Sequence, residues 1–486
     1  MLSWMRDRTP EPNPALVLVL VLVAGGLLAL GYALDARWWA AWLAPAPALA
    51  ALLLSPPRWR PWLGLAIGLA SGALTFGYHI TTGSLAAALV IAAAYAFAWS
   101  STLRLAATAA ERLPAAVAAL VLPTGWAAID TLLIHISPHG SAGSLAYSQA
   151  GVLPVLQVAS LGGVPAITFV ILLPGSVAGL ALARVLGRDI RGLTQATTAA
   201  GAIVGATLLF GLWRLEQPAA RPGPAIAMIA SDRSAPLGRR WSAFIKDYGS
   251  SIDHAARRGV TVLLPEAALR ASPVEADAAA AWFARLAADR GTTFVAGIAV
   301  DGSPRGTNRA LVITPDGERA WYVKQHLVPG LEDGFAAGNA PLIVSTPVAR
   351  SGIAICKDMH FPTLGREYAG GRAKLMLVPA LDFDVDDRSA MAMTVMRGIE
   401  GGFSIARATR QGYSFVSDPF GRIVAERRSG PAAGLLLAHA PGGLAAPTLY
   451  ARVGDLFGWV CVAGLISLWI VVRQRTPAPP TPLPAS

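Results

Sequence analysis

Three polar residues stand at or near the ends of short apolar runs whose composition is typical of buried β-strands. Glu266 follows the run TVLLP, Cys356 ends the run GIAIC, and Lys324 lies in the run WYVKQHLVP. Strand ends in layered α/β folds converge on a crevice, so these side chains are expected to meet. A thiol needs a neighbouring base or positive charge to become a nucleophile at neutral pH. Glu266 can act as that base, and Lys324 can hold the thiolate and then an oxyanion.

Each of these residues, taken alone, has a commoner explanation. A Glu after a strand is usually a rim or helix-cap residue, a strand-end Cys is usually a small core residue, and a Lys is usually solvated. The chain has two cysteines, Cys356 and Cys461, and the second lies inside an apolar segment. The globular part therefore has a single thiol, which is either inert core or chemistry, and no internal disulfide is expected.

Other polar groups predict no metal or cofactor site. One acidic group resembles a calcium loop but lacks its turn Gly and terminal Glu, so a solvated loop is favoured: Asp382, Asp384, Asp386 and Asp387. The histidines His135, His139 and His360 lack the spacing of zinc ligands. No Gly-rich phosphate loop is present. We therefore predict an enzyme that uses neither a metal nor a cofactor.

The composition predicts that much of the chain contacts lipid. It is 54% hydrophobic and 14% charged, whereas soluble proteins are roughly a quarter charged. The net charge of +11 does not indicate nucleic acid, because the basic residues form small groups beside apolar segments. The first apolar run is too long for a signal peptide, so cleavage is not expected. Eight segments are long enough to be candidate spans: 15–34, 39–55, 61–80, 84–103, 114–134, 162–183, 195–213 and 455–472.

The distribution of arginines predicts the orientation of these spans. With the amino terminus in the cytoplasm, the inside segments carry Arg6, Arg8, Arg58, Arg60, Arg104, Arg112, Arg184, Arg188, Arg191, Arg473 and Arg475. The short outside loops carry only Arg37. The predicted domains are a membrane domain of about seven helices (1–214), an extracytoplasmic domain (220–445), a transmembrane helix (453–474) and a disordered Pro-rich tail (475–486).

Residues 220–445 have the pattern of one α/β domain of ordinary size. Strands are predicted at 261–265, 294–300, 310–317, 352–356, 375–380, 403–408 and 413–418. Helical patterns lie between some of them, at about 240–258, 273–290 and 387–400. The fold class is therefore a multi-span α-helical membrane domain joined to an α/β domain.

At these motifs the sequence resembles a known superfamily. LLPEAAL around Glu266, YVKQHLVPGLE around Lys324 and GIAICKDMHFP around Cys356 resemble the three signature regions of the nitrilase, or carbon–nitrogen hydrolase, superfamily. With membrane spans on both sides, the chain resembles the apolipoprotein N-acyltransferase family. PTGWAAID (123–130) and SLAYSQAGVLPVLQVASLGG (144–163) extend the resemblance into the membrane part. It thus covers nearly the whole chain.

The resemblance implies an α-β-β-α sandwich and a two-step acyl transfer. Cys356 would take an acyl chain from a phospholipid as a thioester, and Glu332 would support Lys324. The amino-terminal amine of a lipidated cysteine on a lipoprotein would then accept the chain. The implied location is the bacterial cytoplasmic (inner) membrane, with catalysis on the periplasmic side. Trp241 resembles an aromatic residue that the family uses near its site, although a core role is equally expected.

The sequence also departs from the family pattern. Lys357 and Asp358 stand where the family usually has Tyr and Glu. Asp at the second position is common in the wider superfamily, whereas Lys357 adds a cation that is expected to depress the thiol pKa and to contact substrate. The run PALDFDVDD (379–387) replaces a loop that shapes the family's pocket. The alternatives are therefore an amidase or hydrolase, an acyltransferase for another amine, or a non-catalytic scaffold, which the intact triad argues against.

Overall fold

The computed structural model describes residues 13–218, 222–232 and 238–475. The chain divides into two compact units. The helical unit holds the described residues up to Thr131, together with Pro165–Leu208 and the residues from Phe457 onward. The α/β unit holds Leu132–Val164 and Leu209–Leu456. Arg6, Arg8, residues 220–221 and the Pro-rich tail from 476 lie outside the described residues.

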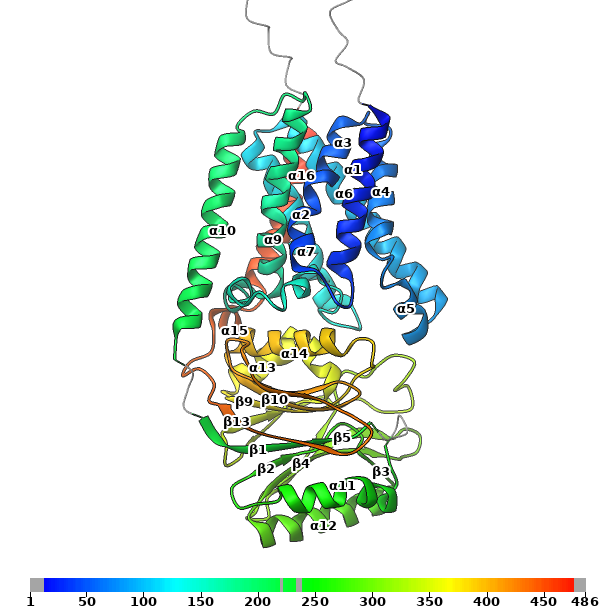
Figure 1. Cartoon of the computed structure of the whole chain (residues 1–486), viewed down its shortest axis with the longest axis vertical. Helices are drawn as coiled ribbons and strands as arrows, with labels where there is room; N and C mark the ends of the chain where they lie inside the picture. Colours follow the sequence, from blue (N-terminus) through cyan, green and yellow to red (C-terminus); the bar gives the residue numbers. More distant parts are fainter. Residues whose placement is uncertain (1–12, 219–221, 233–237, 476–486) are drawn as a thin grey trace, which may run out of the picture. The chain divides into compact units, whose positions relative to one another are not determined.

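Six described helices are long and apolar enough to cross a membrane. They are α1 (Pro14–Tyr32), α6 (Leu85–Arg112), α7 (Ala115–Ile136), α9 (Ala159–Val185), α10 (Leu193–Glu216) and α16 (Leu456–Gln474) (Figure 1). A pair bent by 59°, α4 (Arg60–Ser71) and α5 (Phe76–Thr82), can form a seventh span. The short apolar helices α2 (Trp38–Leu43) and α3 (Pro45–Leu54) cover the second predicted segment. Helices thus lie at all eight predicted segments, and how many of them cross the membrane stays a prediction.

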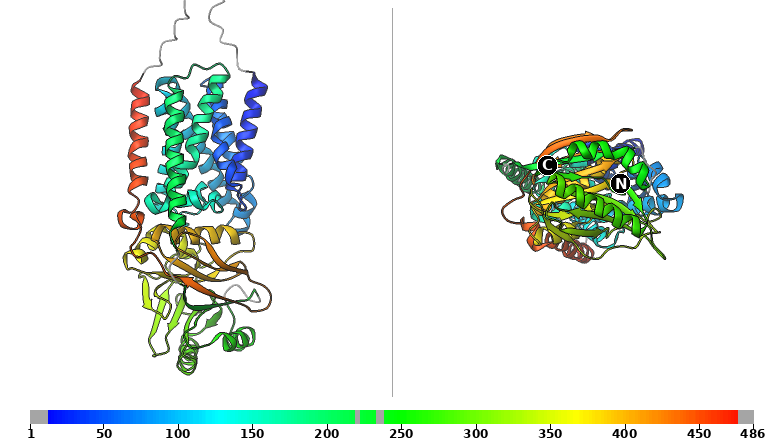
Figure 2. Two further views of the ribbon diagram at one scale, coloured as in Figure 1. Left: turned by 60° about the vertical axis from the view of Figure 1, so that its left-hand side comes forward. Right: turned by 90° about the horizontal axis from the view of Figure 1, so that it is seen from below.

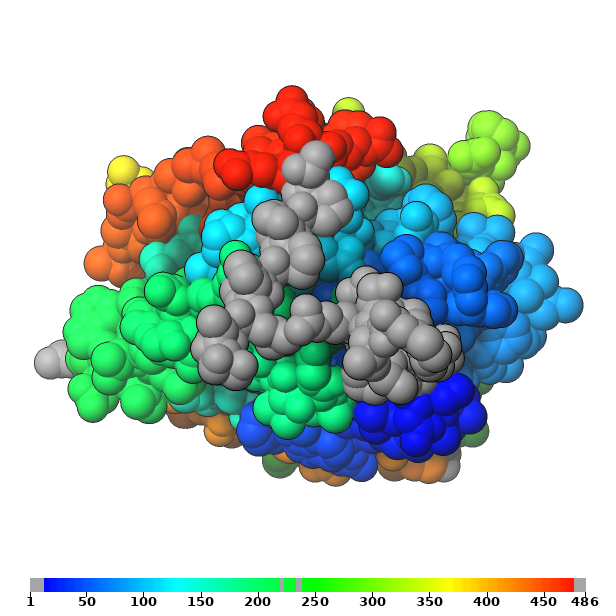
Figure 3. Space-filling view, turned by 90° about the horizontal axis from the view of Figure 1, so that it is seen from above, coloured from blue at the N-terminus to red at the C-terminus, as the bar shows by residue number. Residues whose placement is uncertain are grey.

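Small residues let helices of this unit pack closely. A Cβ on Gly68 of α4 would lie 2.6 Å from the Cα of Ala96 in α6, so only glycine permits this approach. Helices α1 and α16 lie on the outside of the unit in Figure 3. Apolar side chains on them are exposed, for example Leu22 at 65% and Val460 at 58%. Such a surface suits contact with lipid rather than water.

Two β-sheets form the centre of the α/β unit. The first has the order β13-β1-β2-β4-β5-β6, with β3 also paired to β4. Its strands are β1 (Pro222–Ala230), β2 (Thr261–Leu263), β3 (Leu269–Ala271), β4 (Thr293–Val300), β5 (Thr307–Ile313), β6 (Arg319–Val323) and β13 (Gly434–Pro441). The second has the order β12-β11-β10-β9-β8-β7. Its strands are β7 (Leu342–Ser345), β8 (Arg350–Ile353), β9 (Leu375–Leu381), β10 (Ser404–Arg410), β11 (Tyr413–Ser417) and β12 (Ile423–Arg428).

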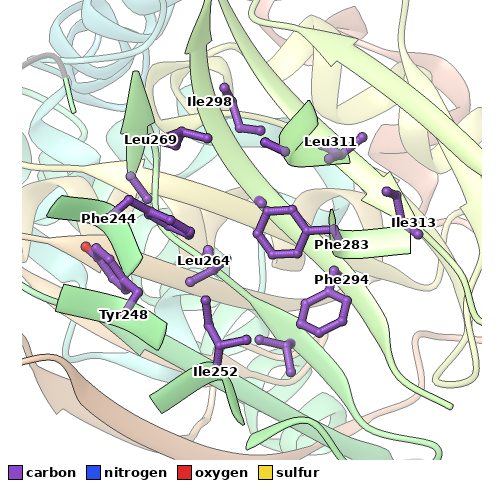
Figure 4. Packing of buried hydrophobic residues seen from close by; sticks show 14 of the residues in the cluster. Phe244, Tyr248, Ile252, Leu264, Leu269, Phe283, Phe294, Ile298, Leu311 and Ile313 are labelled. Atoms are coloured by element: carbon purple, nitrogen blue, oxygen red, sulfur yellow. The ribbon is translucent and has the colours of Figure 1, made fainter. Parts of the chain in front are cut away.

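Helices cover the outer faces of both sheets (Figures 1 and 2). Helices α11 (Trp241–Ala255) and α12 (Pro273–Arg290) pack on the first sheet through an aromatic core that includes Phe244, Phe283 and Phe294 (Figure 4). Helices α13 (Pro362–Gly370) and α14 (Asp387–Gly401) lie on the second sheet. A second core, built from both sheets, fills the space between them and includes Cys356. These layers confirm the predicted α-β-β-α sandwich.

The predicted strands and helices of this unit have counterparts in the structure, with one correction that concerns the site. The strand before the cysteine, β8, ends at Ile353 rather than at Cys356. Cys356 instead begins a 3₁₀ turn, η2 (Cys356–His360). Strands β1, β3, β7, β12 and β13 and helix α13 were not predicted.

The limits of the two compact units also differ from the predicted domain ranges. Residues 132–164 run from the end of α7 to the beginning of α9 and belong to the α/β unit. They include η1 (Leu145–Gln149) and α8 (Leu153–Leu156), and the short helix α15 (Leu449–Val453) joins the same unit near its end. Inside α9, Gly163 adopts φ +69° and breaks the helix at the unit boundary. The predicted domain limits stay predictions.

Candidate active site

Glu266 lies in a tight connection after β2 that reaches the second sheet. Its backbone N–H donates to the carbonyl of Ala380 at the end of β9, at 3.3 Å. A Cβ at Gly297 in β4 would lie 2.7 Å from the Cα of Glu266, so only glycine lets β4 pass behind it. The next residue, Ala267, has a φ of +44°. This strained, closely packed backbone fixes where the carboxylate points.

Lys324 follows directly on β6 and brings the predicted base and charge into contact. Its Nζ donates to Oε1 of Glu266 at 2.7 Å and to Oε2 of Glu332 at 2.8 Å. Its side chain is 1% exposed, and both carboxylates are buried. The structure therefore brings together Glu266, Lys324 and Glu332, as the sequence predicted. The backbone N–H of Val328 also donates to Glu332 at 2.8 Å.

Asn308 in β5 belongs to this cluster and was missed from the sequence. Its Nδ2 donates to Oε1 of Glu266 at 2.7 Å and to Oε1 of Glu332 at 2.8 Å. Because ionised carboxylates only accept hydrogen bonds, the amide nitrogen must face them. In the sequence, Asn308 could have been recognised as an amide side chain within a strand whose other residues are largely buried. One cation and one amide thus hold two carboxylates side by side.

The electrostatics of this cluster set the proton affinities. Burial alone lowers the pKa of the Lys324 ammonium, but Glu266 and Glu332 outweigh it and raise that pKa above its usual value. Burial also raises the pKa of Glu266; Lys324 opposes this rise and Glu332 adds to it. Lys324 therefore stays charged, while Glu266 holds a proton more readily than a solvated Glu.

Cys356 begins the turn η2 with a φ of +46°, a strained conformation for a residue with a side chain. Its Sγ–H donates to the carbonyl of Leu381 at 3.2 Å. Burial raises the pKa of this thiol well above its usual value, and the charge of Glu266 adds to the rise although Lys324 opposes it. The expected depression of the thiol pKa does not hold in this resting site. The thiol needs a base to take its proton.

Asp358 anchors the start of the Cys356 turn. Its Oδ2 accepts from the backbone N–H of Ile355 at 3.0 Å and from the hydroxyl of Tyr322 at 2.8 Å. Its Oδ1 accepts from the N–H of His326 at 2.9 Å. The side chain is fully buried. Asp358 therefore ties the nucleophile turn to β6 and to the loop that follows Lys324, and its supporting role in catalysis stays a prediction.

Lys357 is buried and turns toward the loop after Lys324. Its Nζ donates to the carbonyl of Leu327 at 2.8 Å. Burial lowers the pKa of Lys357 to about 8, and the charge of Lys324 contributes to this. Its contact with substrate stays a prediction. This hydrogen bond links the turn that carries Cys356 to the loop that carries Glu332.

Two other residues named from the sequence lie elsewhere. Trp241 packs against Phe244 and Trp282 in the outer helix layer, so the structure does not bring it to the cluster. Asp382, expected in a solvated loop, is instead buried and accepts both Nη groups of Arg407. Asp382 directly follows Leu381, so its ion pair with Arg407 fixes the backbone carbonyl that accepts the hydrogen bond of the thiol. Sequence reasoning missed Arg407.

No group of three or more His, Cys, Asp or Glu in the described part of the chain is placed to hold a metal ion. The site combines a buried thiol with a carboxylate whose pKa is raised and a fixed ammonium, and the charges of both act on the thiol. Such an arrangement can take a proton from sulfur, hold an oxyanion and return the proton to a leaving group.

Comparisons with known proteins show what the chain is similar to. A carbon–nitrogen hydrolase family model matches residues 231–444, and a model of the apolipoprotein N-acyltransferase amino-terminal domain matches residues 24–177. The apolipoprotein N-acyltransferase of Geobacter metallireducens is 26% identical over 95% of this chain and 97% of its own. That of Bradyrhizobium diazoefficiens is 29% identical over 68% of each chain. Among solved structures, an amidase from Nesterenkonia sp. is 25% identical over 46% of this chain and 93% of its own, with a TM-score of 0.39.

The two family models lie one after the other on this chain and together match most of it. The Geobacter metallireducens relative carries the same name and matches 95% of this chain. The chain is accordingly an enzyme with a catalytic cysteine and a multi-pass bacterial membrane protein. It belongs to the apolipoprotein N-acyltransferase family, a membrane-bound branch of the nitrilase superfamily.

Proposed function

We propose that this enzyme moves an acyl chain from a phospholipid, through a thioester on Cys356, to the amino-terminal amine of a lipidated cysteine on a lipoprotein. One observation carries the chemistry. Lys324 holds Glu266 at 2.7 Å and Glu332 at 2.8 Å, and the charges of Glu266 and Lys324 both act on the pKa of the buried Cys356 thiol. The name of the relatives, apolipoprotein N-acyltransferase, supports acyl transfer to a lipoprotein. The sequence resemblance implies the phospholipid donor, and the apolar helices that precede and follow residues 222–441 in the sequence are compatible with a lipid substrate.

In the first step, Glu266 takes the thiol proton while the sulfur attacks the ester carbonyl carbon of the phospholipid. The oxyanion that forms lies against the Lys324 ammonium, whose raised pKa keeps it charged. The carbon–oxygen bond then breaks, and Glu266 returns the proton to the leaving alkoxide. The products are a thioester on Cys356 and a lysophospholipid.

In the second step, a neutral amine attacks the thioester carbonyl, and Glu266 accepts one proton from its nitrogen. The carbon–sulfur bond breaks, and the proton passes from Glu266 to the leaving thiolate. The burial that raises the thiol pKa also disfavours a free thiolate, so the group is released as a thiol. Glu332 and Asn308 hold Glu266 and Lys324 in register in both steps.

We place the enzyme in the cytoplasmic (inner) membrane with the α/β unit on the periplasmic side. The bias of arginines supports this, since among the short loops between predicted spans those assigned outside carry only Arg37. Alkaline phosphatase fused after residue 217 should be active. An inactive fusion there, beside an active fusion after residue 188, would reverse the orientation.

The catalytic proposal is tested with membranes and phospholipid labelled in its acyl chain. Wild-type protein should gain label that hydroxylamine removes, and Cys356→Ala should gain none. Cys461→Ala is the matched control, because that thiol lies in α16 in the other unit, and it should label like wild type. Equal labelling of Cys356→Ala and wild type would refute the thioester.

The acceptor is tested separately by mass spectrometry of a lipoprotein amino terminus in a host depleted of its own enzyme. Expression of this chain should convert the diacyl form to the triacyl form. A thioester without this conversion would favour the second candidate, an amidase, hydrolase or acyltransferase for another amine. The departure of residues 379–387 from the family pattern is the feature that favours that alternative. Within this run, Asp382 is buried and pairs with Arg407 of β10.

A further inference from the structure

The turn that carries Cys356 is held at two ends by different parts of the chain. Asp358 ties its beginning to β6 and the loop after Lys324. Its last carbonyl, that of His360, accepts hydrogen bonds from residues 137–149, which we call the connector. The connector follows α7, a candidate membrane span, and belongs to the α/β unit. One end of the nucleophile turn thus depends on a segment outside the carbon–nitrogen hydrolase match.

Ser141 makes this contact twice. Its backbone N–H donates to the His360 carbonyl at 3.0 Å, and its Oγ donates to the same oxygen at 2.8 Å. Gly140, at φ +60°, allows the approach, because a Cβ there would lie 2.6 Å from that oxygen. Both lone pairs of the carbonyl can therefore be used by one residue.

The hydroxyl of Ser141 is itself held in place by a second residue of the connector. Its partner is the hydroxyl of Tyr147, at 2.5 Å, which accepts from Nη2 of Arg397 in α14 at 3.1 Å. Arg397 lies 3.2 Å from Glu400, whose Oε1 accepts from the N–H of Val164 at 3.2 Å. Arg397 and Glu400 are both buried. The chain of contacts therefore begins and ends in residues 132–164 and passes through α14.

We propose that the connector, through Ser141 and Tyr147, positions the Cys356 turn for thioester formation. The inference rests on the proposed role of Cys356. The physical reason is the positive φ of Cys356: strained backbone persists only where its surroundings over-determine it. With the His360 end released, the turn can relax toward ordinary φ and carry Sγ away from the Glu266–Lys324 cluster. Ser141 and Tyr147 are positioning residues, since neither touches the thiol.

The test measures the rate at which purified full-length protein, at saturating labelled phospholipid, gains hydroxylamine-sensitive label in a single turnover. Tyr147→Phe keeps the ring and removes the hydroxyl, while Ser141→Ala removes the side-chain donor. Gly140→Ala pushes the connector off the carbonyl. Each should slow labelling about 10- to 100-fold, as expected for a displaced reacting group. Ser141→Thr, which keeps a hydroxyl, should restore much of the rate.

The matched control is Ser148→Ala. Ser148 is a buried serine of the same connector whose Oγ donates to the carbonyl of Leu145 and accepts from Nε2 of Gln149, both within the connector. Its labelling rate should stay within about twofold of wild type, as for most changes away from such contacts. Thermal unfolding of each variant measures the folded fraction, and rates are compared per folded molecule.

The maximal labelling rate and the half-saturating phospholipid concentration distinguish a positioning role of Ser141 and Tyr147 from a merely structural or a lipid-binding role. Positioning predicts a slower rate at saturating phospholipid with an unchanged half-saturating concentration. A normal rate per folded molecule would overturn the proposal, as would a raised half-saturating concentration with an unchanged maximal rate. If wild-type protein itself gains no label, the proposed function fails instead, so the two failures are distinguishable.

Discussion

The two cores of the α/β unit differ in what they bury. The outer core, between the first sheet and helices α11 and α12, is almost wholly apolar and contains Phe244, Phe283 and Phe294 (Figure 4). The inner core lies between the sheets, and at its edge stand buried charged side chains: Glu266, Lys324, Glu332, Lys357, Asp358, Asp382 and Arg407. Apolar burial stabilises a fold at about 25 cal/mol per Å². Buried charges cost stability unless they are paired, so the inner edge reflects chemistry rather than packing.

The largest effect on the inner core is expected from Lys324→Met, which keeps an unbranched apolar side chain and removes the ammonium group. Glu266 and Glu332 then lose their cation, and labelling of Cys356 should fall about 10²- to 10³-fold. Breaking a buried pair also costs about 3–5 kcal/mol of stability. The pKa of Glu266, already raised by burial, rises further without Lys324.

This variant has a distinctive pH dependence. A carboxyl whose folded pKa lies above its unfolded pKa binds its proton more tightly in the folded state, so stability is present at low pH and lost as pH rises. Lys324→Met should therefore gain stability, relative to wild type, as pH falls below neutral. Thermal unfolding between pH 5 and 8 measures this. The same slope in wild type and variant would contradict the assigned charge pairing.

A change in the outer core should lower stability without lowering the labelling of Cys356 per folded molecule. Phe283→Ala removes a fully buried ring that packs against Phe294 and Phe244. The expected loss is about 3–5 kcal/mol of unfolding free energy. Labelling of Cys356 per folded molecule should stay at the wild-type level. A specific loss of labelling would mean that the outer layer also shapes the site.

The same contrast explains what the sequence could reveal. Regular patterns predicted strands β4, β9, β10 and β11 and helices α11, α12 and α14, because apolar periodicity follows from the layers. Strand β1 was missed because PGPAIAMIA is rich in Ala, Gly and Pro, although it pairs with both β2 and β13. Strand β12 was missed because nearly all its residues are exposed.

The triad and Glu332 were predicted because motifs mark them, whereas their partners depend on three-dimensional register. Asn308 meets Glu266 only because β5 pairs with β4 and β6. Asp382 looked solvated because its neighbours in sequence are acidic, and only the position of Arg407 on β10 shows its pairing. The positive φ of Cys356 leaves no mark in composition.

Asn308→Ala tests the inner core with a smaller change. It removes one amide that donates to two carboxylates, at 2.7 and 2.8 Å, and leaves Lys324 in place. Losing a buried donor to charged acceptors costs about 1–3 kcal/mol. We expect a loss of that size in stability or in labelling rate. Asn308→Asp should be worse, because it adds a third negative group, and a neutral result for Asp would contradict ionised partners.

The smallest expected effect concerns Lys357, a buried cation whose Nζ donates to the backbone carbonyl of Leu327 rather than to a carboxylate. Its pKa of about 8 lies below the ordinary lysine value, so the folded protein binds this proton less tightly than the unfolded chain does. Stability should therefore rise with pH above about 8, until the unfolded lysine also loses its proton. Lys357→Gln should remove that slope. If the charge of Lys357 also helps Cys356, wild-type labelling should decline through pH 8 toward the rate of the variant, by a factor of about 10 or less. If labelling depends on pH in the same way in both proteins, Lys357 acts only through its hydrogen bond to Leu327. The difference between the two cores would then depend on the paired charges alone.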